Sequence, residues 1–529
     1  MNVPLTPIRF LHRGVDLFGK KIGVVSGAKR FTYAQYGERC ERLAAALRAL
    51  GIGAGDRVAY LSFNTHQLLE GYFGVIMAGA IVMPLNVRLT PAELIAILNH
   101  SGARVLIFEN DFGSVVEQLQ KTCPSIEHYV TTDEKTPLAG MTYEDLLAGG
   151  RPGRVDYMQV DENSIAELFY TSGSTGTPKG VMLSHRTLYL HGLSVAATFN
   201  REDKAVELHT IPLFHANGWG RPQTAPMMGV KQVMVRRFEP ASVFRLIQEE
   251  KATAMSVVPT MANALLNAPD LAQYDFSSLT QIHIGGAAAS PELIERLERA
   301  FRCTVMAGYG LTESCPVATS GRDKSTIVYK DDRDRIHHRA MAGWPLPANE
   351  VRVVDLHMND VPRDMESIGE VVIRGDNVMD GYYKDPEGTK AVMTGAWLHT
   401  GDMAVWDDEN YIHIVDRKKD IIISGGENIS SIEVEKAIFA HPAVFECAVV
   451  AKPDPKWGEI PVAFVVCKPG HALTAEELCV FLQERIARFK MPRAIEFVED
   501  ALPKTGTGKI VKRALREKFW EGKERRVQG

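Results

Sequence analysis

Strand-like and helix-like segments alternate from about residue 31 to residue 354, and this order constrains the fold more than any other feature of the sequence. Residues 33–50 carry apolar side chains at helical spacing, Gly51 follows as a stop signal, and RVAYLS at 57–62 then has the character of a buried strand. The same order recurs further along the chain. Because parallel strands need helical crossovers, the alternation predicts an α/β fold of mostly parallel sheets covered by helices.

The pattern changes near residue 345. Short alternating runs over 345–425 predict a small β-rich subdomain. After the charged run DRKKD at 416–420, two capping-box patterns introduce helices, at Ser430 with Glu433 and at Thr474 with Glu477. We therefore expect a large N-terminal domain over 1–415 and a small α+β domain over 421–529. On the motif alone, DRKKD is more typical of a solvated turn.

Composition narrows the class of protein. The net charge of −5 argues against a large basic surface for nucleic acid. The seven cysteines are scattered and form no C-x-x-C pair, so we expect neither a disulfide framework nor a structural zinc site. The longest apolar run, at 74–85, is too short to cross a bilayer, and the N-terminus lacks the apolar core of a secretory signal. We expect a cytoplasmic enzyme without an integral membrane segment; peripheral membrane contact, and whether the chain is a monomer or a homodimer, stay open.

The stretch TSGSTGTPKG, residues 171–180, has the composition of a phosphate-binding loop. Glycines allow close approach, hydroxyl groups and backbone N–H groups donate hydrogen bonds, and Lys179 supplies charge. It is not a Walker A motif, because the G-x-x-x-x-G-K-[ST] spacing is absent. Strand-like segments flank it on both sides, and the next helix is expected near Ser184. The sequence therefore predicts a hairpin whose tip binds phosphate, with a purely structural hairpin as the alternative.

With the segment that follows it, this loop resembles the signature of the adenylate-forming superfamily, which contains acyl-CoA synthetases, the adenylation domains of peptide synthetases and firefly-type luciferases. Further stretches match in the same order: GYGLTE at 308–313, TGD at 400–402, DRKKD at 416–420 and PKTGTGK at 503–509. With the N-terminal pattern, the resemblance covers nearly the whole chain. The most similar subgroup is that of bacterial fatty-acyl and medium-chain, methylthiopropionate-type, acyl-CoA ligases.

The resemblance implies a reaction in two steps. A carboxylate attacks the α-phosphorus of ATP to give acyl-AMP and pyrophosphate, and the thiol of CoA then displaces AMP. ATP, Mg²⁺ and CoA are the implied cofactor and co-substrates, and the partners are small molecules. Two alternatives stay open: an adenylation enzyme that loads a separate acyl carrier protein, and a non-catalytic nucleotide-binding protein on the same fold.

The same resemblance implies roles for individual residues. The catalytic set is Lys509, Lys179, Thr312, Glu313 and His215. Mg²⁺ would be held by Glu313, with Thr175. ATP and AMP would be bound by Thr171, Ser172, Gly173, Ser174, Thr175, Gly176, Thr177, Lys179, Gly286, Ala287, Ala288, Gly308, Tyr309, Gly310, Thr312, Asp402, Arg417 and Lys509. Within that set, Tyr309 would stack on adenine, Asp402 would accept both ribose hydroxyls, and Lys509 would bridge the carboxylate and the α-phosphate.

The C-terminal stretches have a further implied role. Lys419 matches the position about which the C-terminal domain turns, so 416–420 is a hinge and 421–529 a mobile domain in this interpretation. Gly425, Gly426 and Glu427 would face CoA. The alternative for Lys509 is an exposed loop lysine without a catalytic role.

The acyl pocket would be formed by His215, Trp219, Gly286 and Gly310. A bulky indole at Trp219 favours short to medium chains, although a core tryptophan and a core histidine explain PLFHANGWG at 212–220 almost as well. The aspartate that binds an amino-acid substrate in many carrier-loading domains has no equivalent in this segment. The charged stretch 321–339 receives no residue role; we expect a solvated loop there, with a mobile lid as the alternative.

Overall fold

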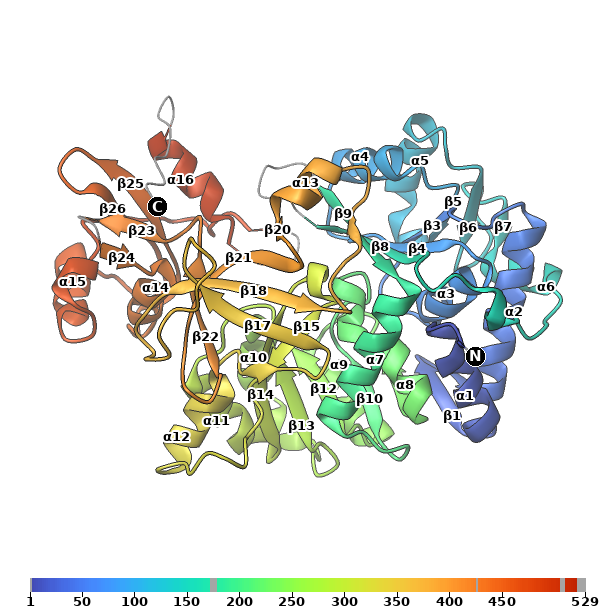
Figure 1. Ribbon diagram of the computed structural model, residues 1–529, viewed down its shortest axis with the longest axis horizontal. Helices are drawn as coiled ribbons and strands as arrows, with labels where there is room; N and C mark the ends of the chain where they lie inside the picture. Colours follow the sequence, from blue (N-terminus) through green and yellow to red (C-terminus); the bar gives the residue numbers. More distant parts are fainter. Residues whose placement is uncertain (1, 172–177, 425–426, 505–509, 521–529) are drawn as a thin grey trace. The chain divides into compact units, whose positions relative to one another are not determined.

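The computed structural model describes residues 2–171, 178–424, 427–504 and 510–520 (Figure 1). Contacts divide the chain into two compact units. The first is Met1–Val351 with Ile373–Leu398 and Glu409–Tyr411, and the second is Arg352–Val372 with His399–Asp408 and Ile412–Gly529. The predicted domain boundary at 416–420 stays a prediction.

The first unit contains two mixed sheets with parallel centres. The first sheet has the order β16-β15-β14-β13-β12-β10-β11-β1-β2, and all pairings from β14 to β1 are parallel. Its strands are β1 (Ile22–Ser26), β2 (Lys29–Thr32), β10 (Val206–His209), β11 (Lys231–Met234), β12 (Ala254–Val257), β13 (Gln281–Ile284), β14 (Thr304–Gly310), β15 (Val317–Ser320) and β16 (Trp344–Pro345).

The second sheet has the order β19-β9-β8-β4-β3-β5-β6-β7. Its strands are β3 (Arg57–Leu61), β4 (Ile81–Pro84), β5 (Val105–Phe108), β6 (His128–Thr131), β7 (Met141–Thr142), β8 (Ile165–Thr171), β9 (Lys179–Ser184) and β19 (Gly381–Tyr382). The antiparallel register of β8 and β9 pairs Tyr170 with Gly180 and Thr171 with Lys179. This confirms the hairpin that was expected to flank the glycine-rich loop.

Helices connect and cover these strands (Figure 1). They are α1 (Ile8–Phe18), α2 (Tyr33–Ala49), α3 (His66–Met77), α4 (Pro91–Ser101), α5 (Gly113–Thr122), α6 (Tyr143–Gly149), α7 (His185–Phe199), α8 (Arg221–Met228), α9 (Pro240–Glu250), α10 (Pro259–Leu266), α11 (Pro291–Phe301), α12 (Asp332–Ala340) and α13 (Pro386–Ala391). The caps follow the sequence: Ser184 accepts a hydrogen bond from the backbone of Thr187 at the start of α7, as expected. The α/β class is confirmed.

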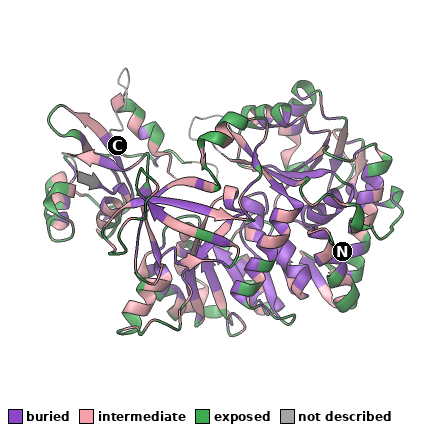
Figure 2. Cartoon of the chain, in the orientation of Figure 1, coloured by how far each residue is buried: buried purple, intermediate pink, exposed green. Residues whose placement is uncertain are grey.

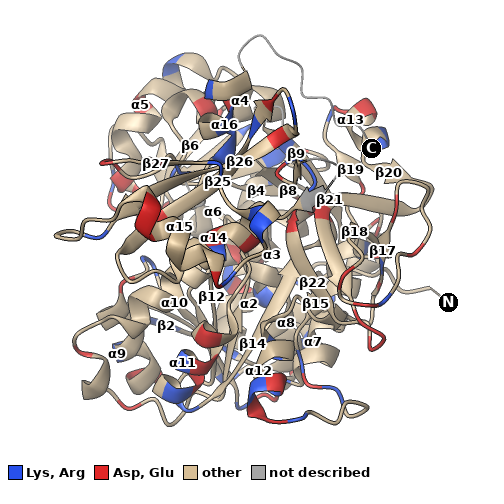
Figure 3. Ribbon diagram, turned by 90° about the vertical axis from the view of Figure 1, so that its left-hand side faces the viewer, with Lys and Arg blue, Asp and Glu red and all other residues tan. Residues whose placement is uncertain are grey.

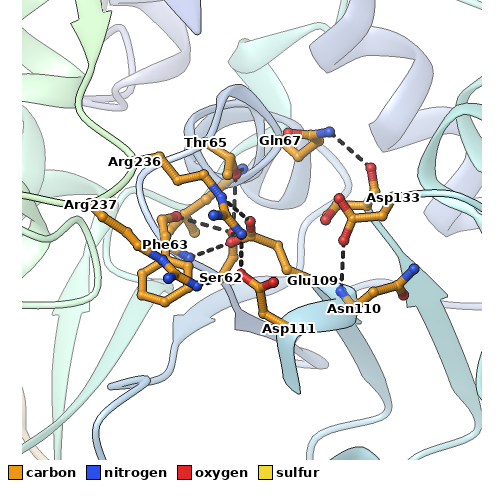
Figure 4. A network of polar contacts seen from close by, with 12 residues as sticks. Ser62, Phe63, Thr65, Gln67, Glu109, Asn110, Asp111, Asp133, Arg236 and Arg237 are labelled. Carbon is orange, nitrogen blue, oxygen red and sulfur yellow. Dashed lines mark hydrogen bonds and ion pairs between the residues drawn. The ribbon is translucent and has the colours of Figure 1, made fainter. Parts of the chain in front are cut away.

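A network of charged residues joins the two sheets of the first unit (Figure 4). Arg236 and Arg237 follow β11, and their guanidinium groups lie 5.0 and 4.5 Å from the centre of the Phe63 ring, at the end of β3. Arg236 Nε is 2.7 Å from a carboxylate oxygen of Glu109, and Arg237 Nη2 is 2.8 Å from Asp111. Both acids follow β5. The two arginines are thus each paired with an acid that follows a strand of the other sheet, and these ion pairs link the two sheets.

The β-rich region predicted over 345–425 is present. It forms a sheet of order β17-β18-β21-β20, with β22 paired to β21. The strands are β17 (Asn349–Val354), β18 (Gly369–Gly375), β20 (Met393–Thr394), β21 (Trp397–Trp406) and β22 (Ile412–Arg417).

The C-terminal part of the second unit has its own sheet and core. The sheet order is β24-β23-β26-β25, and β27 pairs with β26. Its elements are β23 (Ile422–Ser424), β24 (Glu427–Ile429), β25 (Val444–Asp454), β26 (Gly458–Cys467), β27 (Ala494–Phe497), α14 (Ser431–Phe439), α15 (Ala475–Gln483) and α16 (Lys512–Trp520). The capping box of Thr474 and Glu477 forms in full, whereas at Ser430 only the bond from the Glu433 backbone is present. Figure 2 shows buried residues running along the strands of each sheet.

The expectation of a solvated loop over 321–339 was wrong for its second half, whereas residues 321–331 lie outside helices and strands. Residues 332–340 form α12, whose acidic and basic residues are coloured in Figure 3. Arg339 is 2.7 Å from Glu298 and also pairs with Asp323, while the guanidinium of Arg322 lies 3.8 Å from the centre of the Trp344 ring. Such ion pairs and ring contacts order a segment whose composition alone indicates solvation. Within the described ranges, no helix combines the length and the apolar character that crossing a membrane requires.

Candidate active site

Three predicted motifs of the first unit meet at Gly285. A Cβ atom at this glycine would lie 3.0 Å from Cη2 of the Trp219 indole and 3.1 Å from the carbonyl oxygen of Gly308. Gly285 follows β13 and Gly308 lies in the neighbouring parallel strand β14, so both stand at the carboxyl end of the first sheet. Ligands of parallel α/β sheets bind at this edge. The structure thus brings PLFHANGWG, GGAAAS and GYGLTE together.

The loop after Gly285 is open to a ligand. Gly286, Ala287 and Ala288 are exposed. Gly286 has a φ of 75°, and a Cβ there would lie 3.2 Å from Val258, so the backbone takes a conformation that favours glycine. Gly310, in the same region, admits no side chain, because a Cβ would lie 1.7 Å from the carbonyl oxygen of Pro316.

Trp219 is presented by a left-handed turn. Ala216, Asn217, Gly218 and Trp219 have φ values of 46°, 41°, 58° and 60°. Consecutive non-glycine residues in this region are strained, and tertiary contacts have to hold them. Here the amide of Asn217 accepts a hydrogen bond of 2.8 Å from the backbone N–H of Gly220 and donates one of 3.3 Å to Glu167.

The segment before the turn is fixed from the second sheet. Asn64 donates hydrogen bonds to the backbone of His209 and Ile211 at 2.9 and 3.0 Å and accepts one from Leu213 at 2.7 Å. The Tyr72 hydroxyl donates to the carbonyl oxygen of Leu213 at 2.6 Å. His215 follows directly and is half-buried. Neither Asn64 nor Tyr72 stands out in the sequence, because Asn64 lies in a short connection between β3 and α3 and Tyr72 lies in the middle of α3.

Glu167 is a buried acid beside this turn. It lies in β8, is 1% exposed, and accepts hydrogen bonds from the side chains of Asn217 and Gln223 at 3.3 and 2.5 Å. Burial raises the pKa of Glu167 to about 8, and the two amide donors offset part of this effect. Sequence reasoning missed this residue, because a single glutamate in a strand carries no signal of its own.

Lys179 and Glu313 meet at Tyr382. The Tyr382 hydroxyl donates a hydrogen bond of 2.9 Å to the Glu313 carboxylate, and the ammonium of Lys179 lies 4.5 Å from the centre of the same ring. Lys179 is also 3.4 Å from Asp385. Burial, and then the Glu313 charge, raise the pKa of Tyr382. Tyr382 and Asp385 were missed, although both lie in GYYKDP at 381–386, which begins with β19.

This arrangement suits a hard cation. Mg²⁺ usually takes one or two carboxylates together with phosphate oxygens and water. Glu313 lies in the 3₁₀ turn Thr312–Ser314 and keeps a half-buried carboxylate whose orientation is fixed by the Tyr382 hydroxyl. The described side chains contain no cluster of three or more histidine, cysteine or acidic groups around a common point. A single carboxylate with phosphate ligands is therefore the kind of site that these residues fit.

In the second unit, Asp402 and Arg417 pair directly. Their Cα atoms are partners in the antiparallel register of β21 and β22, and Arg417 Nε lies 2.9 Å from Asp402 Oδ1. The Asp402 side chain is 7% exposed and that of Arg417 is 53% exposed. A buried carboxylate with an exposed guanidinium beside it can accept two hydroxyl donors while its charge stays balanced.

Contacts on both sides of Lys419 involve the C-terminal elements. Asp416 is buried and accepts hydrogen bonds from the backbone and the hydroxyl of Ser431 at the start of α14. Arg516, on α16, donates to the carbonyl oxygen of Lys419 at 2.6 Å and to Asp420 at 2.9 Å. Lys419 itself is exposed. The run DRKKD is therefore partly built into the second unit and is not only a solvated turn.

Several predicted residues lie outside the described part of the chain: Ser172, Gly173, Ser174, Thr175, Gly176, Thr177, Gly425, Gly426 and Lys509. Glu427 begins β24. Thr171, Gly308, Tyr309 and Gly310 are half-buried, and Thr312 is buried. The roles expected for all these residues stay predictions.

Two family models match the chain. The model described as AMP-binding enzyme matches residues 11–383, and the model described as AMP-binding enzyme C-terminal domain matches residues 433–509. The first alone spans more than half of the sequence.

Curated relatives match over nearly their whole length. A long-chain-fatty-acid–CoA ligase of Thermus thermophilus is 40% identical over 519 residues, which cover 96% of this chain and 95% of the relative. The butyrate–CoA ligase AAE11 of Arabidopsis thaliana is 35% identical over 536 residues, with coverage of 98% and 93%. Among solved structures, the anthranilate CoA ligase AuaEII in complex with anthranoyl-AMP matches with a TM-score of 0.86 at 26% identity, covering 98% of each chain.

Proposed function

Because this chain belongs to the AMP-binding enzyme family, as an acid–thiol ligase of the AMP-forming acyl-CoA synthetase type, we propose that it joins a short- to medium-chain carboxylic acid to CoA. In the first step the carboxylate oxygen attacks the α-phosphorus of ATP, and the bond to the pyrophosphate oxygen breaks. In the second step the CoA sulfur attacks the acyl carbonyl carbon, and AMP leaves. The reaction takes place in the cytoplasm in this proposal.

The observation that carries the proposal is the convergence at Gly285. Trp219 and Gly308 lie against this glycine, and the exposed loop of Gly286 to Ala288 follows it. A ligand bound along this loop would have small side chains and backbone on one side and the indole on the other. We propose that adenine and the acyl carboxylate bind along this loop, with Tyr309 against adenine, His215 and Gly310 beside the carboxylate, and Trp219 as a wall of the acyl pocket.

Charge at the phosphates would come from the chain and from Mg²⁺. Two anions approach each other in the first step, so positive charge and oriented donors lower its barrier. Lys179 would contact the leaving pyrophosphate together with the loop 171–177, Thr312 would contact the α-phosphate, and Glu313 would hold Mg²⁺. Bound there, Mg²⁺ would neutralise charge that develops on the phosphate oxygens.

Residues of the second unit would bind the ribose of the nucleotide. They would also allow the C-terminal domain to change its orientation between the two half-reactions. We propose that Asp402 accepts the ribose hydroxyls, that Arg417 contacts the ribose or phosphate, and that the C-terminal domain turns about Lys419. Lys509 would act in the first step. The stretch with Gly425, Gly426 and Glu427 would face CoA in the second.

Family membership does not determine the chain length of the acid substrate. The curated relatives are named for long-chain fatty acids and for butyrate, so family membership leaves a wide range. The indole against Gly285 supports the shorter part of that range, because it fills space at the edge of the sheet where an acyl chain would enter.

Pyrophosphate release tests the proposal. The assay contains ATP, Mg²⁺ and one acid from a panel from acetate to palmitate, with methylthiopropionate, benzoate and several amino acids, each with and without CoA. We expect release that rises several-fold on addition of CoA for one class of acid. Release that ignores CoA would assign the acyl group to a carrier protein, and an absence of release with every acid would contradict ligase activity toward this panel.

A further inference from the structure

One face of the first sheet is polar where a buried parallel sheet is normally apolar. In β10, Val206 and Leu208 join the hydrophobic core on one face, whereas Glu207 and His209 point to the other. Gln232 in β11, Ser256 in β12 and His283 in β13 are also buried there. Contacts to α8, and to Phe199 of α7, show that this polar face lies under these two helices (Figure 1).

Two arginines close over this face and share one acid. Arg201 Nη1 lies 2.6 Å from Glu207, and Arg221 Nε lies 3.8 Å from the same carboxylate. All three side chains are at most 6% exposed. Burial, and then the two arginines, lower the pKa of His283 well below its usual value, and burial lowers that of His209 to about 4, so both imidazoles are neutral at pH 7. The cluster therefore has a net positive charge inside the protein.

Several donors of this cluster have no acceptor. Among the described residues, no hydrogen-bond partner lies within reach of Arg201 Nε, Arg221 Nε, Arg221 Nη1 or Gln232 Nε2, and all four atoms are buried. An unpaired buried charge is costly, and nearly all buried donors in native proteins are satisfied. A bound carboxylate would balance the positive charge and would give the donors an acceptor. It carries one negative charge and can accept two parallel hydrogen bonds from a guanidinium.

The cluster is close along the chain to residues that lie at the proposed acyl pocket. A guanidinium nitrogen of Arg201 lies 3.3 Å from His283 Nε2. His283 precedes Gly285 by two residues, and residues two apart in an extended segment face the same side of the sheet, about 7 Å apart. Arg221 follows Trp219 by two residues, and the indole of Trp219 lies against Gly285. An acyl chain that entered past the indole along this face would meet Arg221 and Arg201.

We propose that Arg201, Arg221 and Gln232 bind a distal carboxylate of the acid, so that the substrates are dicarboxylic acids activated at one end. This inference rests on the proposed function and narrows its substrate class. A monocarboxylic acid of the same length would place its methyl end against a net charge and leave the donors unpaired. Sites built to bind a polar group reject analogues that lack it by factors that reach about 10⁴.

The test compares acids of equal carbon number. Butyrate is paired with succinate, hexanoate with adipate and octanoate with suberate, and kcat/KM is measured from pyrophosphate release with CoA present. For the preferred length we expect kcat/KM to be about 10²- to 10⁴-fold higher for the dicarboxylate than for the monocarboxylate. Equal or better use of the monocarboxylate in all three pairs would overturn the inference but leave the ligase proposal intact. Failure of every acid, of either class, would remove both.

Variants of Arg221 then test whether this buried cluster causes the preference for the dicarboxylate. Arg221→Met removes the charge at nearly constant volume, and we expect the ratio of the two kcat/KM values to fall to parity or below. Arg221→Lys keeps a charge without the paired donors and should retain part of the preference. The matched control is Arg245→Met on α9, an exposed arginine paired with Glu249, which should leave the ratio unchanged. An unchanged ratio in folded Arg221→Met, or a melting temperature of the wild type that rises equally with chloride, phosphate and adipate, would contradict the assignment.

Discussion

The side-chain amide of Asn217 donates a hydrogen bond of 3.3 Å to Glu167, and this bond links a strained, left-handed turn to a buried acid. Because the folded-state pKa of Glu167 is about 8, above its ordinary value of 4.5, the protonated acid is the favoured form inside the protein. Its contribution to the free energy of unfolding is complete below about pH 4.5 and is lost as the pH rises through about 8. The slope over this window is at most about 1.4 kcal/mol per pH unit.

Glu167→Gln should therefore flatten the pH dependence of stability. A glutamine can accept from Asn217 and donate to Gln223 Oε1, which has no partner among the described residues. We expect the variant to be more stable than the wild type at pH 8.5 and similar at pH 5, as measured by chemical denaturation. Glu167→Ala should lose stability at both pH values, and parallel curves for the wild type and Glu167→Gln would assign the pH dependence elsewhere.

Asp402→Asn should weaken nucleotide binding. The substitution keeps the shape of the side chain but removes the charge that would accept two ribose hydroxyls, and it breaks the ion pair with Arg417. The loss of a charge-assisted hydrogen bond costs about 1.5–3 kcal/mol, which predicts a rise of about 10- to 150-fold in the KM for ATP. The KM for the acid should change little. A matched exposed pair, Arg374 with Glu350, provides the control substitution Glu350→Gln.

Tyr382→Phe should raise the concentration of Mg²⁺ that the enzyme needs. The variant removes only the hydroxyl that orients Glu313 and leaves the ring under Lys179. Loss of a group that orients a metal ligand typically costs about 10- to 100-fold in metal affinity or activity. Titration of activity with Mg²⁺ measures this. Tyr383→Phe, one residue away, removes a hydroxyl that bonds to Ser101 and should titrate like the wild type.

Trp219→Ala should widen the range of chain lengths that are accepted. The change removes the indole from Gly285 and opens the edge of the first sheet. Profiles of kcat/KM against carbon number, for the monocarboxylate and the dicarboxylate series alike, should become broader. Gly285→Ala should act in the opposite direction, because its Cβ would lie 3.0 Å from the ring. Identical profiles for all three proteins would assign the tryptophan to packing alone.

Lys509→Ala should separate the two half-reactions. If Lys509 bridges the carboxylate and the α-phosphate, its loss reduces acyl-AMP formation by about 10²- to 10³-fold, by analogy with lost oxyanion donors. Formation of acyl-CoA from supplied acyl-AMP should be spared. Equal losses in the two assays would contradict this division of roles.

The sequence predicted the elements that depend on local pattern. The alternation of helix and strand, the hairpin of β8 and β9 and the start of α7 next to Ser184 all follow from neighbouring residues. The motif residues Lys179 and Glu313 were also expected to share a function, and they meet at Tyr382.

Long-range contacts could not be predicted in this way. Glu167 is separated by 50 residues from Asn217, and the cluster of Arg201, Glu207, Arg221 and His283 draws on a loop, a helix and two strands. Seen in the sequence alone, each of these residues is equally compatible with an ordinary exposed position. The helix within 321–339 was missed for the same reason, because charged residues of this stretch find partners as distant in sequence as Glu298 and Glu409.

The hydrogen bonds around Lys419 bear on how fast such an enzyme could exchange between its two half-reactions. Asp416 stands three residues before Lys419, yet it bonds to Ser431 at the start of α14, which comes after it. A turn of the backbone at Lys419 would separate these partners, whereas Arg516 would move together with the carbonyl group that it binds. The lifetime of each orientation would then depend on the strength of the Asp416–Ser431 bonds.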